Sequence, residues 1–327
     1  MELLKVKKIE YLRISVTDRC NFQCKYCSSD KDYRFISQSE ILSYEEICEL
    51  VRVFKTIGIK AVRITGGEPL VRKGIENLIY QLKEIGIEDV SLTTNGYFLA
   101  EKSETLKEAG LNRVNVSLDS LKPEKFSYIT GKDKESFHKV LEGIERAIKV
   151  GLNPVKINVV LIKDFNDDEI GDFISFSENY GVEVRFIELM PVGNSSFSHS
   201  HFIPISHLKK LIEKNWGKLI PTKTFKKGPA KSYIVENTKA VLGFIPSVSE
   251  HFCSECNRLR LTPEGKLRLC LMRDEEVDLK CIIRSSDYSP EKLKEVIVNA
   301  IERKKQINGI DALESLGCQR KMFSIGG

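Results

Sequence analysis

Short apolar runs alternate with amphipathic stretches along the first 190 residues of the chain. Six runs rich in valine, isoleucine and leucine predict strands that are buried on both faces: Tyr11–Val16, Ala61–Thr65, Val90–Thr94, Arg113–Leu118, Lys156–Ile162 and Glu183–Glu188. Helical patterns lie between them; one begins after Ser43, one runs from Phe137 to Val150, and one opens at Asn166. Six βα units in a row predict a parallel sheet that is curled into a partial (β/α)6 barrel of the TIM type.

The pattern changes after about residue 191, where a loop rich in glycine and serine begins. Ile205–Trp216 then predicts a helix, and a last helix is expected from about Pro290 to Lys305. Between them lie two predicted hairpins: Ser232–Val235 with Ala240–Phe244, and Arg258–Leu261 with Lys266–Leu269. We therefore expect a barrel core over residues 1–191 and a smaller α+β extension over residues 192–327.

The composition, 41% hydrophobic and 30% charged over 327 residues, is ordinary for a globular protein. The net charge of +5 is too small to indicate binding of nucleic acid, but it suits an anionic small substrate if the arginines gather in one cleft. No apolar run is long enough to predict a membrane span, and the polar N-terminal stretch does not resemble a signal peptide. Nine cysteines in such a chain indicate reduced thiols and bound metal in the cytoplasm, not disulfides.

Three cysteines follow the first predicted strand in the pattern C-x3-C-x2-C: Cys20, Cys24 and Cys27. Three thiolates can hold a 4Fe-4S cluster and leave one iron open to a ligand. A zinc site is the alternative for clustered cysteines, although zinc sites usually pair two C-x2-C halves. The spacing resembles that of the radical S-adenosylmethionine (SAM) superfamily, in which the open iron binds SAM and an electron from the cluster cleaves it to a 5′-deoxyadenosyl radical.

Further motifs follow the ends of the other predicted strands. Gly66-Gly67-Glu68-Pro69 follows the second strand, where glycines would let the backbone approach a ligand and a carboxylate could accept from its amino group. Asn95-Gly96, Asp119-Ser120 and Met190-Pro191 follow the third, fourth and sixth strands. Because the chemistry of such barrels lies at the carboxyl ends of the strands, we expect the active site there.

A second group of three cysteines lies in the C-terminal region: Cys253, Cys256 and Cys270. It could be a zinc knuckle completed by His251, or a second three-thiolate cluster with an open iron. On the predicted strand between these cysteines, Arg258 and Arg260 point to the same face. Two guanidinium groups beside a cluster would suit a phosphate-rich ligand, whereas without the cysteines a solvated charged face would be the simpler interpretation.

These motifs together resemble the GTP 3′,8-cyclase family, whose members open molybdenum cofactor biosynthesis. The resemblance covers essentially the whole chain and rests on both cysteine groups and on further stretches: Arg63–Pro69, Thr93–Gly96, Val114–Asp119, Lys156–Val160, Arg185–Met190, Phe252–Arg260 and the terminal Gly326-Gly327. It implies a lyase that converts GTP to 3′,8-cyclo-7,8-dihydro-GTP after the 5′-deoxyadenosyl radical has removed the 3′ hydrogen of the ribose.

The resemblance also implies a role for individual residues. Cys20, Cys24 and Cys27 would hold the SAM cluster and would count, with Arg258 and Arg260, as catalytic; Cys253, Cys256 and Cys270 would hold an auxiliary cluster whose open iron contacts the guanine. The SAM pocket would be lined by Tyr26, Gly67, Ser117 and Met190. GTP would be bound by Arg13, Arg63, Thr93, Lys156, Arg185, Arg258 and Arg260, and the Gly326-Gly327 tail would reach into the active site. Some relatives have a lysine two residues before the counterpart of Arg63, where this chain has Ala61 beside Lys60, so the resemblance does not extend to that phosphate contact.

The implied cofactors are SAM and two 4Fe-4S clusters, and the implied partners are a reductase or flavodoxin-type electron donor and a downstream cyclic pyranopterin synthase. A homodimer is a further expectation, because members of the family often dimerise. One alternative is a radical SAM enzyme that modifies a peptide or small molecule, but it would leave Arg258, Arg260 and the Gly-Gly tail unexplained. A non-enzymatic metal-binding scaffold is the other alternative, and without a continuous basic stretch it would not bind nucleic acid. The sequence assigns no role to Cys48, Cys281 or Cys318.

Overall fold

The computed structural model describes residues 8–27, 33–190, 197, 199–222, 230–250, 256–307 and 320–326. Their strands form one sheet in the order β12-β11-β10-β1-β2-β3-β4-β5-β6-β9-β8-β7. The strands are β1 (Tyr11–Ser15), β2 (Ala61–Thr65), β3 (Asp89–Thr94), β4 (Arg113–Ser117), β5 (Val155–Leu161), β6 (Glu183–Glu188), β7 (Leu219–Pro221), β8 (Lys231–Val235), β9 (Val241–Ile245), β10 (Arg258–Leu261), β11 (Lys266–Arg268) and β12 (Glu276–Asp278).

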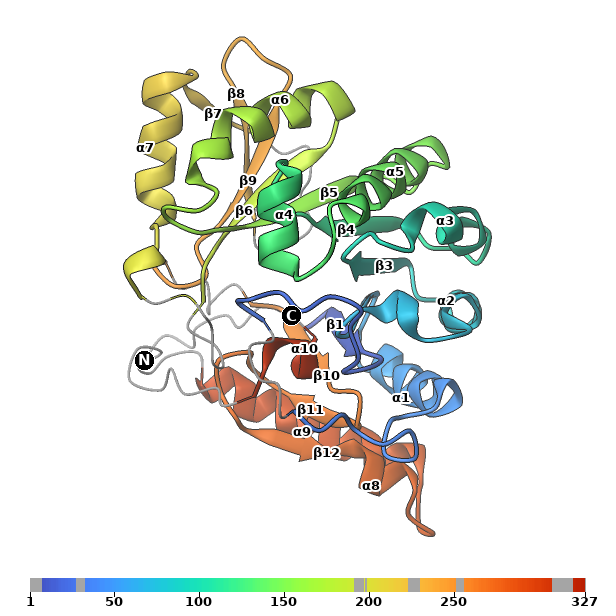
Figure 1. Ribbon diagram of the computed structural model, residues 1–327. Helices are drawn as coiled ribbons and strands as arrows, with labels where there is room; N and C mark the ends of the chain where they lie inside the picture. The colour runs from blue at the N-terminus through green and yellow to red at the C-terminus, as the bar shows by residue number, and fades with distance from the viewer. Residues whose placement is uncertain are drawn as a thin grey trace.

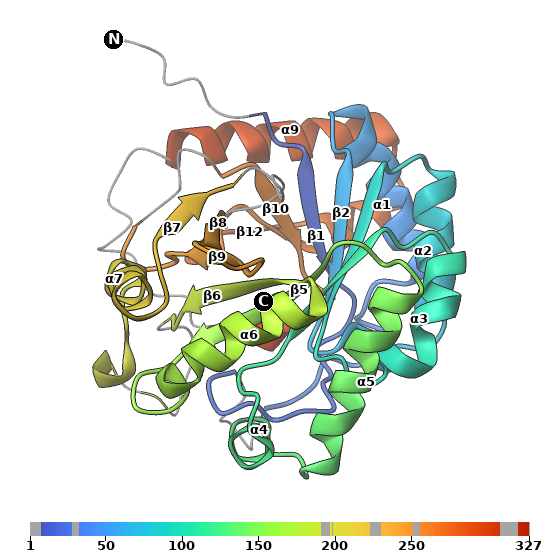
Figure 2. The same cartoon turned by 90° about the horizontal axis from the view of Figure 1, so that it is seen from above.

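Helices α1, α2, α3 and α5 run along the outer side of the curved sheet, and α10 lies inside it (Figures 1 and 2). The helices are α1 (Tyr44–Thr56), α2 (Ile75–Glu84), α3 (Leu99–Glu108), α4 (Pro123–Thr130), α5 (Glu135–Lys149), α6 (Ile170–Tyr180), α7 (Ile205–Asn215), α8 (Leu279–Ile283), α9 (Pro290–Ile307) and α10 (Met322–Ile325). Short 3-10 turns occur at η1 (Pro69–Val71), η2 (Asp167–Glu169) and η3 (His199–His201). No helix in the described ranges is long and apolar enough to cross a membrane.

The predicted partial (β/α)6 barrel is confirmed. Strands β1 to β6 pair in parallel and in chain order, and their ends differ from the predicted ones by no more than a residue. Helix α1 begins after Ser43, as predicted, with a capping box: the Glu46 amide donates to the Ser43 hydroxyl at 3.2 Å and the Ser43 amide donates to the Glu46 carboxylate at 2.8 Å.

The C-terminal strands extend the barrel sheet at both of its edges. The hairpins β8–β9 and β10–β11 form as predicted. Strand β10 then pairs in parallel with β1, and β9 pairs in parallel with β6. These pairings cover two edges that would otherwise expose unpaired backbone groups, and they bring C-terminal side chains next to those of the barrel. The loop predicted after residue 191 lies largely outside the described residues.

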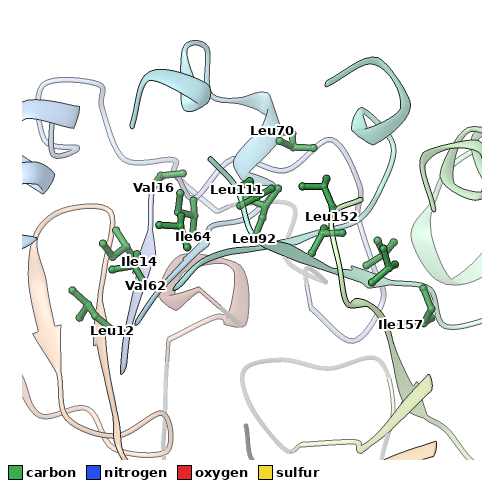
Figure 3. Packing of buried hydrophobic residues seen from close by; sticks show 14 of the residues in the cluster. Leu12, Ile14, Val16, Val62, Ile64, Leu70, Leu92, Leu111, Leu152 and Ile157 are labelled. Atoms are coloured by element: carbon green, nitrogen blue, oxygen red, sulfur yellow. The ribbon is translucent and has the colours of Figure 1, made fainter. Parts of the chain in front are cut away.

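The two faces of the sheet differ in chemistry. Leu12, Ile14 and Val62 have no exposed surface and pack in one apolar cluster with residues of the outer helices; Figure 3 shows their side chains. Their chain neighbours Arg13 and Arg63 therefore point to the inner face, because successive side chains alternate. Both faces are buried, as the sequence suggested, but the inner face is polar and charged.

Candidate active site at the carboxyl ends of the strands

The loop after β1 carries the first cysteine group at the carboxyl edge of the sheet. The Phe22 amide donates to Cys20 Sγ at 3.4 Å, and the side-chain amide of Asn95, just after β3, reaches the same sulfur at 3.9 Å. The loop is fixed to the end of α4, since the Gln23 amide donates to the Thr130 carbonyl at 2.9 Å. The segments that follow β1 and β3 thus meet at Cys20, and the end of α4 holds the same loop at Gln23.

Burial raises the pKa of all three thiols in this loop. The pKa of Cys20 rises to about 11 and that of Cys27 to about 12, and that of Cys24 rises well above its usual value. Neighbouring charges add to the effect of burial: Glu68 acts on Cys20, Asp119 acts on Cys24, and the sulfurs act on one another. A bound metal would remove this penalty, because it binds the thiolates directly.

The donor set of this loop is three free thiols, which fits an iron–sulfur cluster. A zinc site needs its sulfurs around one point at about 2.3 Å. In a 4Fe-4S cluster each cysteine binds its own iron, so the sulfurs of Cys20, Cys24 and Cys27 can lie further apart.

The two glycines after β2 allow the backbone to pack against the cysteine loop. A Cβ atom on Gly67 would lie 2.4 Å from the Arg19 carbonyl oxygen, and one on Gly66 would lie 2.8 Å from that of Thr17. The Gly67 amide donates to the Thr17 carbonyl at 2.7 Å. The close approach that the sequence suggested is therefore made, within the protein, to the segment leading into Cys20.

Glu68 is buried beside this loop and accepts three hydrogen bonds. Its carboxylate accepts from the Thr94 hydroxyl at 2.7 Å, the Asn95 amide at 2.7 Å and the Leu70 amide at 3.0 Å. Burial raises the pKa of Glu68 to about 7, although these donors act in the opposite direction. The carboxylate holds η1 and the end of β3 together and places a titratable group near Cys20.

Asp119 fixes the ring of Tyr26, the residue before Cys27. The Tyr26 hydroxyl donates to Asp119 at 2.7 Å, and the Val160 amide donates to the other carboxylate oxygen at 2.8 Å. Burial raises the pKa of Asp119 to about 6 against the lowering effect of both donors. From the sequence, Asp119 is visible as a residue that follows a strand, but its role is not. The half-buried Ser117 ends β4 two residues earlier.

Three arginines lie side by side on the inner face. Arg13 on β1 is in register with Arg63 on β2 and with Arg260 on β10, while Arg258 is in register with Tyr11. Adjacent strands are about 4.8 Å apart, so these guanidinium groups repel one another. Burial and the neighbouring positive charges lower the pKa of Arg13 well below its usual value and that of Arg260 to about 10.

A second positive group lies further round the same face. Lys156 on β5 and Arg185 on β6 both pair with the buried carboxylate of Glu183, at 2.9 and 2.8 Å. The Ser232 hydroxyl, on β8, also donates to Glu183, at 2.5 Å. Burial and Arg185 lower the pKa of Lys156 to about 8, although Glu183 opposes them. Glu183 stands in no sequence motif, and its role is visible only from its partners on neighbouring strands.

Several buried polar atoms on the inner face lack a hydrogen-bond partner within the described ranges. They include Nε of Arg63, Oγ1 of Thr93 and Oδ1 of both Asn115 and Asn158. Buried polar atoms are rarely left without partners in native proteins, and such exceptions need a reason. A polar ligand that enters the inner face and forms hydrogen bonds with these atoms would explain why they lack partners within the protein.

Two cysteines of the C-terminal group lie beside the arginine row. The Met272 amide donates to Cys270 Sγ at 3.4 Å, and the buried Lys304 amino group lies 3.7 Å from Cys256 Sγ. Burial raises the pKa of Cys256, but the positive charges of Lys304 and Arg258 outweigh it and the pKa is lowered. These two thiols, one of them favoured as a thiolate, fit a metal cluster. Cys253 and His251 lie outside the described residues.

The end of the chain reaches the centre of this site. The Gly326 carbonyl accepts from the Arg260 guanidinium at 3.0 Å and from the Thr65 hydroxyl at 3.4 Å. The amide of Phe323 donates to the Cys27 sulfur. Met190 packs against Ile325 of the same segment. Gly327 lies outside the described residues.

The remaining cysteines and lysine of interest lie elsewhere. Cys48, on α1, is buried and donates to the Gln81 side chain at 3.0 Å, while Cys281 on α8 is exposed. Cys318 lies outside the described residues. Lys60 precedes β2 and is exposed, and Ala61 faces Tyr11 across the β1–β2 pair.

Comparisons with known proteins agree with this arrangement. Residues 14–177 match the radical SAM superfamily, and residues 182–310 match the family described as Molybdenum Cofactor Synthesis C. The chain is 45% identical to a GTP 3′,8-cyclase of Syntrophomonas wolfei and 46% identical to one of Thermodesulfovibrio yellowstonii, each over 98% of both chains. The crystal structure of Streptococcus suis SuiB bound to S-adenosylmethionine shares the fold, with a TM-score of 0.59 at 16% identity over 83% of this chain and 63% of that one. The chain therefore belongs to the GTP 3′,8-cyclase family of radical SAM proteins.

Proposed function

We propose that this protein converts GTP to 3′,8-cyclo-7,8-dihydro-GTP, with SAM as the source of the radical, at the start of molybdenum cofactor biosynthesis. The observation that carries the proposal is the row of arginines on the inner face between the two cysteine groups, in which Arg13 is half-buried and Arg63 and Arg260 are buried. A radical reaction started at the first group would reach a substrate held on this row. The GTP 3′,8-cyclases that the chain resembles support the choice of nucleotide.

A triphosphate is the kind of ligand that this row favours. Guanidinium groups stay charged and match phosphate oxygens with paired N–H donors. In the protein alone, burial and mutual repulsion disfavour the charges of Arg13 and Arg260. A bound polyanion would oppose both burial and repulsion, because its negative charges stabilise the charged guanidinium groups. We assign the triphosphate and ribose to the set expected from the sequence: Arg13, Arg63, Thr93, Lys156, Arg185, Arg258 and Arg260.

The SAM cluster would be held by Cys20, Cys24 and Cys27, and when bound it would supply the electron that cleaves SAM and releases the 5′-deoxyadenosyl radical. The chain itself binds and orients the reactants. Tyr26, Gly67, Ser117 and Met190 are assigned to the SAM pocket. Tyr26 is fixed for this by its hydrogen bond to Asp119. The burial of the site keeps water away from the radical.

Cys253, Cys256 and Cys270 would hold the second 4Fe-4S cluster, whose open iron would bind the guanine. The cationic surroundings of Cys256 support this part of the proposal. Residues 1–191 would then form the SAM-binding core, and residues 192–327 would add the auxiliary cluster. The Gly326-Gly327 tail would contribute to the GTP pocket beside Arg260.

The same function implies partners and a compartment. A cluster that cleaves SAM needs an electron donor, for which we propose a reductase or a protein of the flavodoxin type. The product would pass to cyclic pyranopterin synthase. The cytoplasm suits the free thiols of the described residues, because thiols stay reduced there. A homodimer is proposed from the family alone.

The test is an anaerobic assay of nucleotide dependence. The protein is reconstituted with iron and sulfide, reduced and given SAM, and 5′-deoxyadenosine is measured with GTP, ATP, CTP, UTP or no nucleotide. The proposal predicts that GTP alone stimulates formation and yields a cyclised guanosine nucleotide by mass spectrometry. Formation that ignores GTP would contradict the proposed substrate.

A further inference from the structure

Residues 320–326 form a short segment that is enclosed by the barrel. Phe323, Ser324 and Ile325 of α10 are buried, and Leu271 and Met272 pack against Ile325. At the end of the segment, the Gly326 carbonyl accepts from Arg260 at 3.0 Å. The position of this carbonyl therefore helps to decide how the Arg260 guanidinium is turned.

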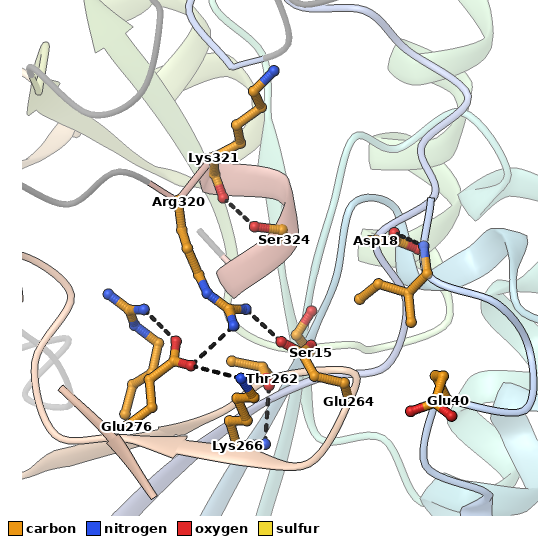
Figure 4. A network of polar contacts seen from close by, with 12 residues as sticks. Ser15, Asp18, Glu40, Thr262, Glu264, Lys266, Glu276, Arg320, Lys321 and Ser324 are labelled. Atoms are coloured by element: carbon orange, nitrogen blue, oxygen red, sulfur yellow. Dashed lines mark hydrogen bonds and ion pairs between the residues drawn. The ribbon is translucent and has the colours of Figure 1, made fainter. Parts of the chain in front are cut away.

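The other end of the segment is held by ion pairs. Arg320 donates to the carboxylates of Glu264 and Glu276, the latter at 2.9 Å (Figure 4). Glu276 also binds Arg268 at 2.5 Å and lies 3.5 Å from Lys266. Burial lowers the pKa of Arg320, but the hydrogen bond and charge of Glu264 outweigh it and the pKa is raised. The pairs are partly shielded from water, since both carboxylate side chains are 13% exposed.

Both ends of the segment are attached to the same hairpin. Arg260 lies on β10, and Glu264 lies in the turn that joins β10 to β11. Glu276 begins β12, the neighbour of β11. One turn of helix separates the ion pairs at Arg320 from the carbonyl of Gly326. Fixing one end of so short a segment restricts where the other end can lie.

We propose that Arg320 is a positioning residue for substrate binding: its ion pairs with Glu264 and Glu276 hold the tail so that the Gly326 carbonyl orients Arg260. The inference rests on the proposed function, because Arg260 is assigned there to GTP. Without these pairs the tail leaves the hairpin more often, and Arg260 loses the acceptor that turns it toward the substrate. GTP binding should suffer most, because Arg260 depends on the Gly326 carbonyl, whereas the tail touches Cys27 and Met190 through the buried Phe323 and Ile325, which should stay packed inside the barrel.

The experiment compares reconstituted holoenzymes that carry Arg320→Met, Glu264→Gln or both. The control is Arg284→Met, which removes an arginine of the same C-terminal region that binds Glu46 at 2.6 and 3.0 Å and does not touch the tail. Three quantities are measured: hydrogen exchange of the amides of residues 320–326, the Kd for GTP and the Kd for SAM. Iron content and visible absorption report on the clusters.

Arg320→Met should speed exchange in the tail and raise the Kd for GTP about tenfold, a typical size for coupling between connected sites. The Kd for SAM and the iron content should not change. The double variant should bind GTP no more weakly than Arg320→Met alone, because both substitutions remove the same ion pair between Arg320 and Glu264. Arg284→Met should match the wild type in all three quantities.

Unchanged exchange and unchanged GTP affinity in Arg320→Met would overturn the proposal. Loss of iron or of SAM binding in that variant would also overturn it, because Arg320 would then act on the general structure. A wild-type enzyme that binds no GTP would overturn the proposed function instead. The exchange comparison would still decide whether Arg320 holds the tail.

Discussion

Replacing Arg63 by methionine should make the protein more stable while it weakens GTP binding. Arg63 is 5% exposed, and its Nε has no hydrogen-bond partner within the described residues. Burial lowers its pKa to about 10, with Arg113 and Arg185 adding to the effect and Tyr11 opposing it. Methionine has a similar length and no charge, so the variant removes the cost in folding free energy of burying the Arg63 charge.

The magnitude follows from the change in pKa. One pKa unit corresponds to about 1.4 kcal/mol, so the fall from the ordinary guanidinium value costs the folded state about 3 kcal/mol. The folded pKa lies below the unfolded one, so the penalty is fully present at any pH below about 10 and disappears only at higher pH. The guanidinium lies 5.7 Å from the centre of the Tyr11 ring, and losing that contact costs about 1 kcal/mol. We expect a net gain of about 2 kcal/mol at pH 7.

The assay is thermal unfolding under anaerobic conditions with and without GTP. Wild-type protein should be stabilised by GTP, because a ligand that binds only the folded state raises the Tm. Arg63→Met should have a higher Tm than the wild type without GTP and a much smaller response to GTP. A lower Tm combined with a normal GTP response would refute the reasoning.

Arg113→Met is the matched control. Arg113 is also a buried inner-face arginine, but it pairs with Asp89 through two bonds of 3.0 and 2.8 Å. Its removal leaves a buried carboxylate without its partner, which typically costs about 3–5 kcal/mol. The two substitutions should therefore change the Tm in opposite directions.

Three further predictions concern the rest of the site. Gly326→Ala should lower turnover at least tenfold with both clusters intact by visible absorption, because φ is 72° and the new Cβ would lie 2.4 Å from the Thr65 hydroxyl; unchanged turnover would contradict the placing of the tail. Glu183→Gln should lower the free energy of unfolding in urea by about 3 kcal/mol, because Lys156 and Arg185 lose their shared partner; a stability equal to that of the wild type would count against this pairing. Cys24→Ala should lose the iron of the first cluster and all formation of 5′-deoxyadenosine, and persistent formation would exclude Cys24 as a ligand.

The barrel could be predicted because its signals are local. Each strand alternates between side chains for the helical layer and side chains for the inner face, and Ser43 with Glu46 marks the start of α1. The two C-terminal hairpins were also readable from their short turns. Their pairing with β1 and β6 was not, because it joins residues far apart in the sequence, such as Leu12 and Leu259.

The residues of the site could likewise be predicted only in part from the sequence. Cysteine spacing and the arginines on β10 are visible in the sequence. Glu183 reads as an ordinary first residue of a strand, and only the register of β5 and β6 shows that it binds Lys156 and Arg185. Arg320 stands in no motif, and its partners Glu264 and Glu276 are identified only by the folded hairpin.

The most direct test of the central claim follows the transfer of the C3′ hydrogen of GTP to 5′-deoxyadenosine. The reconstituted, reduced protein is given SAM and GTP deuterated at C3′, and the 5′-deoxyadenosine that forms is analysed by mass spectrometry. The account predicts that this product carries one deuterium and that a cyclised guanosine nucleotide accumulates with it. 5′-Deoxyadenosine without deuterium, formed equally well without GTP, would contradict the claim that GTP is held on the arginine row for attack at C3′.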